Sequence, residues 1–125
     1  MEEYNVYSVI GEEGFERLIA AFYRQIPGDE VLGPMYAGRD LVAAEQRLRD
    51  FLVVRFGGPS RYLDQRGHPR LRMRHMPFTI DQKARDRWLS LMNAAFEEAK
   101  LPPDAEGVLR AFFDSTATFL INRAE

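Results

Sequence analysis

Residues 66–78 read Arg66-Gly67-His68-Pro69-Arg70-Leu71-Arg72-Met73-Arg74-His75-Met76-Pro77-Phe78 and contain both histidines of the chain. Four arginines stand around the two histidines, and an apolar Met-Pro-Phe run ends the stretch. In a helical protein, imidazole and guanidinium groups beside apolar residues suit an anionic, largely apolar cofactor that needs one nitrogen ligand. The same pattern is also compatible with a metal site or with a basic loop that docks an acidic partner.

The composition predicts one globular domain over residues 1–125, without cysteine chemistry. Hydrophobic residues make up 46% of the 125 residues and charged residues 29%, as in soluble proteins. A net charge of −2 provides no overall basic field for nucleic acid. The absence of cysteine excludes disulfides, thiolate catalysis and iron–sulfur clusters. The sequence has no signal-peptide pattern and no apolar run near the ~20 residues of a membrane span, which favours a cytoplasmic location.

Apolar residues recur at three- and four-residue steps in four segments, which predicts four amphipathic helices and an all-α fold. The first segment ends at Pro27-Gly28, and the second is expected to begin at an Asp40 cap and to stop at Gly57-Gly58-Pro59. A capping box at Thr79-Ile80-Asp81-Gln82 predicts that Thr79 caps the third helix. The fourth follows the break at Leu101-Pro102-Pro103-Asp104. Residues 60–77 keep no such period and are expected to form loops and two short helical turns.

His75 is the strongest candidate ligand in this irregular segment. It precedes the third predicted helix and is expected to lie opposite the helix at 41–56. Zinc is disfavoured, because His68 and His75 are seven residues apart and no third ligand is near them. Haem iron needs only one strong protein ligand, for which histidine is the commonest residue. The alternative is an ordinary surface or hydrogen-bonded histidine.

The arginines and polar aromatic residues extend the same hypothesis. Arg74, beside His75, and Arg47, on the facing helix, are the arginines that we expect to pair with the carboxylates of a porphyrin. Tyr23 and Trp88 fall on apolar helix stripes, and Tyr36 lies at a corner. Each aromatic residue taken alone is compatible with a core residue whose polar atom meets a backbone carbonyl. Together with an iron ligand, they predict a pocket for a polar diatomic molecule.

With these residues, the chain resembles the truncated haemoglobins of group II, especially actinobacterial members of the haemoglobin O type. The resemblance runs from about residue 4 to about residue 122. It rests on Phe22-Tyr23, Tyr36, Phe56-Gly57-Gly58-Pro59, Tyr62, residues 66–75, Pro77-Phe78 and Trp88. One departure is Gly11-Glu12-Glu13-Gly14, which only approximates the glycine pair common between the first two helices of the family.

The resemblance implies a globin-like two-on-two helical sandwich around haem b, with His75 as the proximal iron ligand. It implies that Tyr23, Tyr36 and Trp88 donate hydrogen bonds on the distal side. It assigns His68 a structural role in shaping the loop. The further residues that it places at the haem are Ala44, Arg47, Leu48, Phe51, Leu52, Arg74 and Phe78. Ala44 stands where vertebrate globins have the distal histidine.

The resemblance implies that the protein binds O2, NO and CO. Two or three donors would slow the release of O2, so we expect redox chemistry rather than bulk transport. Nitric oxide dioxygenase and peroxidase-like activities both fit, and each needs an electron donor that the sequence does not identify. The pattern is compatible with an oligomer. The competing hypothesis is a cofactor-free helical interaction module that binds an acidic partner through Arg66–Arg74.

Overall fold

The computed structural model describes residues 1–60, 64–65, 67, 69–76 and 78–123. Short 3₁₀ turns, η1 (Glu3–Asn5) and η2 (Ile26–Gly28), flank the first helix. The helices are α1 (Val6–Gln25), α2 (Leu32–Tyr36), α3 (Leu41–Arg55), α5 (Leu71–His75), α6 (Gln82–Ala99) and α7 (Pro103–Phe119). The described residues form no strand, which confirms the predicted all-α fold. None of the helices described is long and apolar enough to cross a membrane.

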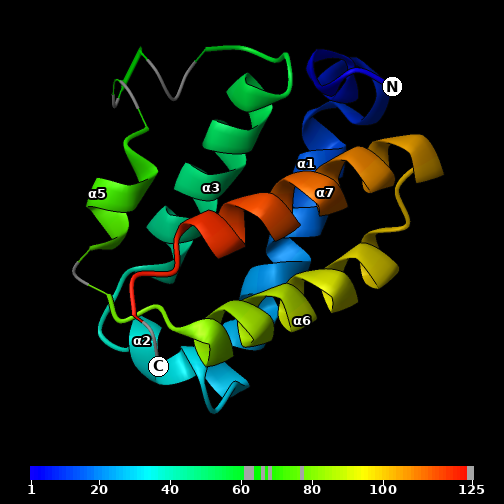
Figure 1. Cartoon of the computed structure of the whole chain (residues 1–125). Helices are drawn as coiled ribbons and strands as arrows, with labels where there is room; N and C mark the ends of the chain where they lie inside the picture. Colours follow the sequence, from blue (N-terminus) through cyan, green and yellow to red (C-terminus); the bar gives the residue numbers. More distant parts are fainter. Residues whose placement is uncertain (61–63, 66, 68, 77, 124–125) are drawn as a thin grey trace.

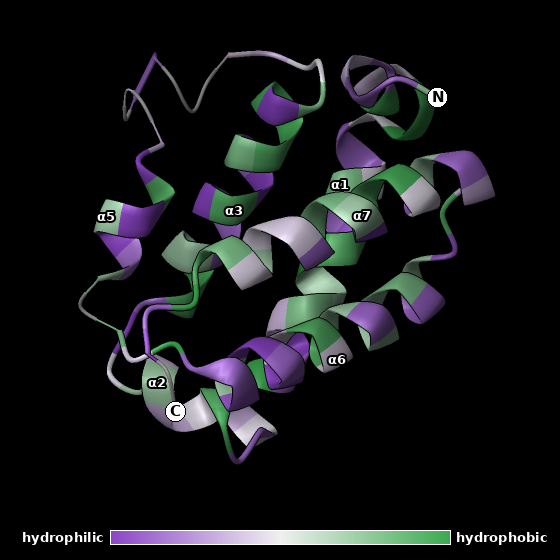
Figure 2. Ribbon diagram, in the orientation of Figure 1, coloured by the Kyte–Doolittle hydropathy of each residue, from purple (hydrophilic) through white to green (hydrophobic). Residues whose placement is uncertain are grey.

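Four long helices form the body of the protein. α1 packs against α3 and α6, and α6 packs against α7, which crosses in front of α1 in Figure 1. α5 is drawn apart from this body, on the side of α3. The short α2 lies at the end of α1 and contacts α6. Figure 2 shows hydrophobic and hydrophilic residues alternating along α1, α6 and α7, as expected for helices that bury one side.

Two glycines shape the start of α1. Gly11 has a φ of +67° and a ψ of −179°, so the helix is kinked there into a short first part and a longer second part. A Cβ atom added to Gly14 would stand 2.6 Å from the Cβ atom of Ile10, so the two parts of the helix approach closely at this glycine. The approximate glycine pair of the sequence therefore serves as the break between two helices. After the break, Phe15, Leu18, Ile19 and Phe22 are fully buried, as their spacing predicts.

The end of α3 meets the N-terminus at another pair of glycines. Gly57 has a φ of +99°, and a Cβ atom on it would lie 2.0 Å from the carbonyl oxygen of Tyr4. The amide of Tyr7 donates to the carbonyl of Phe56 over 3.0 Å, which joins the start of α1 to the same corner. The predicted stop of this helix is confirmed, and the close approach of Tyr4 explains why glycine is required.

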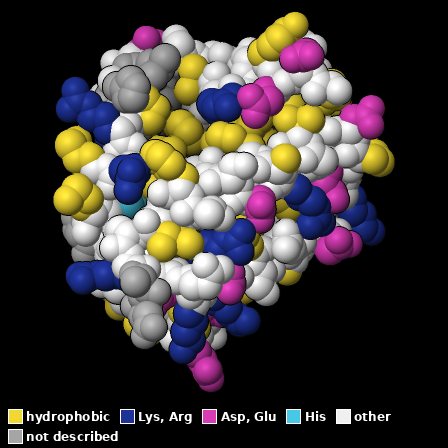
Figure 3. Space-filling view, in the orientation of Figure 1, with side chains coloured by type: hydrophobic (Ala, Val, Ile, Leu, Met, Phe, Trp, Pro, Cys, Tyr) yellow, Lys and Arg dark blue, Asp and Glu magenta, His cyan; other side chains and the backbone are white. Residues whose placement is uncertain are grey.

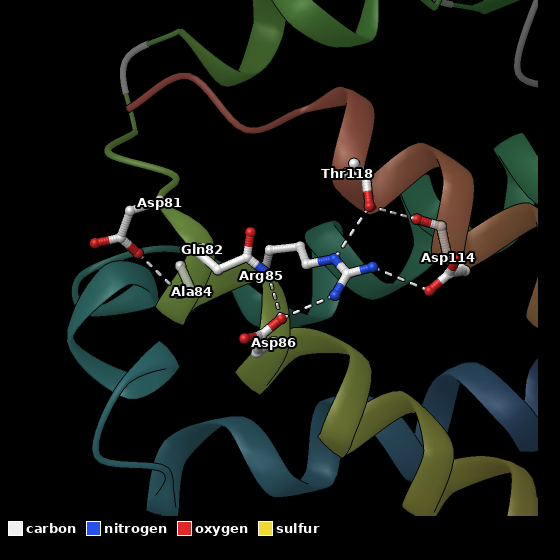
Figure 4. Close-up of polar contacts among 7 residues, drawn as sticks. All are labelled: Asp81, Gln82, Ala84, Arg85, Asp86, Asp114 and Thr118. Carbon is white, nitrogen blue, oxygen red and sulfur yellow. Dashed lines mark hydrogen bonds and ion pairs between the residues drawn. The ribbon is translucent and has the colours of Figure 1, made fainter. Parts of the chain in front are cut away.

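Of the two helix caps predicted from the sequence, the structure confirms that of α3 and differs at that of α6. The Asp40 side chain accepts from the Ala43 amide over 3.1 Å, so the predicted cap of α3 is confirmed. The prediction of Thr79 as the cap of α6 is wrong. Asp81 is the cap and accepts from the Ala84 amide over 2.8 Å, as Figure 4 shows. Ile80, between Thr79 and this cap, is bonded to the C-terminal segment: its carbonyl oxygen accepts from the amides of Asn122 and Arg123.

Replacing Gly57 with alanine is expected to destabilise the protein by about 3 kcal/mol, because the substitution adds both backbone strain and a clash with the Tyr4 carbonyl. Urea unfolding followed by circular dichroism measures the change. Gly107→Ala is the control, since Gly107 lies in α7 with no atom within 4 Å of an added Cβ. That variant should gain about 0.5–1 kcal/mol from helix propensity. Equal stability of Gly57→Ala and the wild type would refute this account of the corner.

Candidate functional site

His75 ends α5, and its ring is fixed by the same turn of helix. Its Nδ1 atom donates to the carbonyl oxygen of Leu71, four residues earlier, over 2.7 Å. A carbonyl only accepts, so this bond places the ring proton on Nδ1 and leaves the lone pair of Nε2 available to a metal. The side chain is half-buried, and the Phe78 ring lies 6.3 Å from it. The imidazole is therefore oriented as iron-binding histidines usually are.

The loop after His75 is fastened by a residue that the sequence did not single out. Nδ2 of Asn122 donates to the carbonyl oxygens of Phe78 (2.9 Å) and His75 (3.4 Å). Its Oδ1 atom accepts from the Ile80 amide over 2.9 Å. Asn122 lies more than forty positions from its partners along the chain, so no local pattern indicates this contact.

Tyr23, Tyr36 and Trp88 form a tyrosine–tryptophan cluster, although they come from three helices. The Tyr23 and Tyr36 rings meet edge to face, with centroids 6.1 Å apart. Phe22, which the sequence did not assign to the site, contacts both Tyr23 (5.2 Å) and Trp88 (4.9 Å). The expected gathering of three polar aromatic residues is therefore present in the structure.

Burial changes the acidity of the two phenols in this cluster. Burial, foremost, and a hydrogen bond to Tyr36 raise the pKa of Tyr23. Burial also raises the pKa of Tyr36, while hydrogen bonds from Tyr23 and Trp88 act to lower it. Both phenols therefore keep their protons at neutral pH, and each O–H can donate a hydrogen bond.

Arginines line the rim of this region at the corner between α2 and α3. A surface hollow of about 410 Å³ is lined by Ala37, Gly38, Arg39, Asp40 and Arg47. Arg39 lies over the Phe78 ring at 4.3 Å from its centroid, so the corner touches the loop that follows His75. The charge of Arg39 acts on Tyr36 and that of Arg47 acts on Tyr23. Arg39 was missed at the sequence level, whereas Arg47 was expected here.

Arg74 belongs to the exposed side of α5. In Figure 3, Lys and Arg side chains stand among hydrophobic ones on the side of the molecule where α5 lies in Figure 1. The arginine-rich stretch is thus a basic surface beside His75.

The apolar residues that the resemblance assigns to the haem pocket lie along α3. Ala44 and Phe51 are buried, Leu48 is half-buried, and Leu52 is completely enclosed in the protein core. Phe51 also contacts Phe112 of α7, with ring centroids 6.4 Å apart. The structure therefore gives Leu52 a packing role, and the contribution of all four to the pocket stays a prediction.

An ion pair between the buried Asp29 and the exposed Arg87 joins the elements that carry Tyr36 and Trp88. Asp29 accepts from the amides of Val31 (3.1 Å) and Leu32 (2.8 Å) at the start of α2. Its second oxygen accepts from the guanidinium of Arg87, the neighbour of Trp88 in α6. These bonds, that from Leu32 foremost, lower the pKa of Asp29 against the effect of burial. Asp29 therefore holds the corner that carries Tyr36 against α6.

Tyr62, Arg66, His68 and Pro77 lie outside the described residues, so the structural role predicted for His68 stays a prediction. Within the part of the chain that the structure describes, no group of three or more His, Cys, Asp or Glu side chains could hold a metal ion. The described site is accordingly one with a single imidazole.

Comparisons with known proteins agree with this geometry. A family model of bacterial-like globins matches residues 5–122. Group 2 truncated hemoglobin YjbI of Bacillus subtilis (strain 168) is 34% identical over 119 residues, covering 95% of this chain and 89% of that protein. The crystal structure of a haemoglobin from the actinobacterium Thermobifida fusca has 45% identity and a TM-score of 0.91, covering 96% of this chain and 98% of that one. A truncated oxygen-avid haemoglobin from Bacillus subtilis has 33% identity and a TM-score of 0.88, with 94% and 98% covered.

The Asp29–Arg87 pair makes a prediction about pH. Because the folded-state pKa of Asp29 lies below its ordinary value of 3.8, its carboxylate stabilises the fold above that value. This stabilisation is lost as the pH falls through the folded-state pKa. Asp29→Asn should therefore lower the free energy of unfolding at neutral pH. As the pH falls, the variant should lose less of its remaining stability than the wild type does. Urea unfolding between pH 7 and pH 3 measures both effects. Glu30→Gln, at the exposed neighbouring position, should behave as the wild type. Parallel pH curves for Asp29→Asn and the wild type would contradict the assignment.

Proposed function

This chain belongs to the bacterial-like globin family, as a group 2 truncated haemoglobin, and from that premise we propose that it binds O2 tightly through the tyrosine–tryptophan cluster. Its cofactor is haem b. Haem supplies an iron atom with one coordination position for a protein nitrogen and another for a small ligand. The observation that carries the proposal is the pair of Tyr23 and Tyr36 phenols, whose rings meet with centroids 6.1 Å apart and whose pKa values are raised by burial.

The residues present fit haem. The Nδ1 bond to Leu71 leaves Nε2 of His75 as the ligand atom, and the bond raises the basicity of the ring. Ala44, Leu48, Phe51 and Phe78 would provide apolar contacts for the porphyrin. The carboxylates of the porphyrin would pair with Arg47 and Arg74, to which the structure adds Arg39 as a third guanidinium at the rim.

The small Ala44 side chain can neither donate a hydrogen bond nor block the pocket, so donation falls to the tyrosine–tryptophan cluster. The cluster is well suited to hold a polar ligand. The Tyr23 and Tyr36 rings pack edge to face, and Phe22 contacts both Tyr23 and Trp88, so these side chains need little further ordering when a ligand accepts a hydrogen bond. A hydrogen bond contributes about 0.5–1.5 kcal/mol, and more when the acceptor carries charge. Two such bonds would slow the release of O2 by about 10–100-fold.

Slow release favours redox chemistry over bulk transport. The haemoglobin from Bacillus subtilis that is 33% identical to this chain is oxygen-avid, which supports the proposal that this chain also binds O2 tightly. We accordingly propose that O2 is consumed in the pocket, for example in the oxidation of NO to nitrate with an electron from a reductase. Peroxide reduction is the other reaction that the oxidisable side chains of the cluster favour. NO and CO would enter the same pocket as alternative ligands.

The cofactor-free interaction module is not favoured. Family membership accounts for the partly buried tyrosine–tryptophan cluster and for the bonded imidazole, which an interaction module does not need. The exposed arginines of α5 are compatible with both hypotheses and do not decide between them.

Replacing His75 with alanine is expected to abolish or greatly weaken the retention of haem, because the single nitrogen ligand is lost. The Soret absorbance of protein purified after haemin addition measures retention. His68→Ala is the control, since the sequence assigns that residue no ligand role. Wild-type protein that stays colourless with haemin would refute the haem assignment, and red His75→Ala protein would refute the ligand.

Replacing Tyr36 with phenylalanine removes one of the proposed donors and should speed the release of O2 by about 3–10-fold, as stopped-flow measurement would show. Tyr23→Phe and Trp88→Phe each remove another proposed donor of the same cluster, so each should act in the same direction. Tyr7→Phe serves as a matched control, because Tyr7 packs near the N-terminal corner beside Phe15 and Gly58. Unchanged release in all three cluster variants would show that the cluster is not the donor.

A further inference from the structure

We propose that Asn122 is a positioning residue that sets the orientation of the His75 imidazole toward the haem iron. It acts from the C-terminal segment, through the backbone of the loop after His75. The inference rests on the proposed function in one respect, namely that His75 is the iron ligand.

The contacts of Asn122 bracket the loop on both sides. Its amide nitrogen Nδ2 bonds the carbonyls of His75 and Phe78, and its Oδ1 bonds the amide of Ile80. The main chain adds two bonds, from the Asn122 amide (2.8 Å) and the Arg123 amide (3.1 Å) to the Ile80 carbonyl. One side chain thus fixes three positions between the iron ligand and the start of α6.

α5 has particular need of such a contact. It has only five residues, and a helix of that length is not stable by itself. His75 is its last residue, so its carbonyl has no partner within the helix. That carbonyl instead accepts from the Phe78 amide (3.0 Å) and from Asn122 (3.4 Å). The end of α5 is therefore fixed by contacts from outside the helix.

The C-terminal segment is itself anchored. Arg85, in the first turn of α6, bonds Asp114 (3.0 Å) and Thr118 (3.1 Å) near the end of α7, as Figure 4 shows. Asn122 follows four residues after Thr118. The path from the packed α6–α7 pair to His75 therefore runs through Arg85, the end of α7 and Asn122.

The test uses Asn122→Ala in the haem-loaded protein. The variant loses the three side-chain bonds and keeps the two main-chain bonds, so the segment should stay in place. The iron–histidine stretching band of the ferrous protein should shift or broaden in resonance Raman spectra, because the imidazole is less firmly oriented. Haem transfer to apomyoglobin should become about 3–10-fold faster. Asn93→Ala is the matched control: it removes a similar exposed bond, to Arg110 (3.0 Å), which joins α6 to α7 and does not involve the loop after His75, and it should change neither readout.

Two further variants separate positioning from general stability. Asn122→Asp keeps an acceptor for Ile80 but turns a carboxylate toward two carbonyls, so it should shift the band at least as much as alanine does. In His75→Gly protein supplied with free imidazole, the imidazole ligand has no covalent link to the chain. There, Asn122→Ala should leave the iron–imidazole band unchanged.

An unchanged band in both Asn122→Ala and Asn122→Asp would overturn the inference while leaving the haem assignment intact. An equal shift in Asn93→Ala, or a shift in the imidazole-supplied background, would also overturn it, because either would indicate a general loss of structure. Failure of the proposed function looks different, since the wild type would then show no iron–histidine band at all or His75→Ala would keep it.

Discussion

The bond from Nδ1 of His75 to the Leu71 carbonyl is the constraint on which the rest of the site depends. It fixes which ring nitrogen carries the proton, and it does so with backbone that lies within one helical turn. The bond requires that residues 71–75 be helical, although so short a helix has little stability of its own. The surrounding structure therefore has to maintain α5, and the contacts of Asn122, Phe78 and Arg39 meet at its end.

The opposite wall of the pocket is assembled from separate elements and has its own fixed points. Tyr36 ends α2, and Trp88 lies within α6, so their relative placement depends on how α2 is docked. Asp29 provides that link, because one carboxylate bonds both the start of α2 and Arg87. The cation–π contact of Arg39 with Phe78 then joins this wall to the loop on the His75 side. Polar side chains at the rim thus connect both sides, in addition to the hydrophobic core against which Tyr36, Trp88 and Leu71 pack.

The sequence predicts well what local chemistry determines. The helical stripes, the Asp40 cap and the stop at Gly57-Gly58 depend on neighbours a few residues away, and each is confirmed. Thr79 was assigned wrongly because Asp81, two residues later, is itself a good capping residue and accepts from the Ala84 amide. Arg39 and Asn122 could not be found, since their partners lie far along the chain. Asp29 did have a local signal, an aspartate three residues before the start of a short helix.

The burial of the two tyrosines has a consequence for the setting in which the protein works. Because burial raises the pKa of both phenols above an already high ordinary value of 10.0, neither loses its proton across the range of pH found in cells. Histidine, the usual distal donor, changes charge within that range, whereas a phenol donor does not. If these phenols donate to the ligand as proposed, their hydrogen bonds keep the same strength on acidification or alkalinisation of the surroundings, so proton concentration does not release the ligand through the two tyrosines.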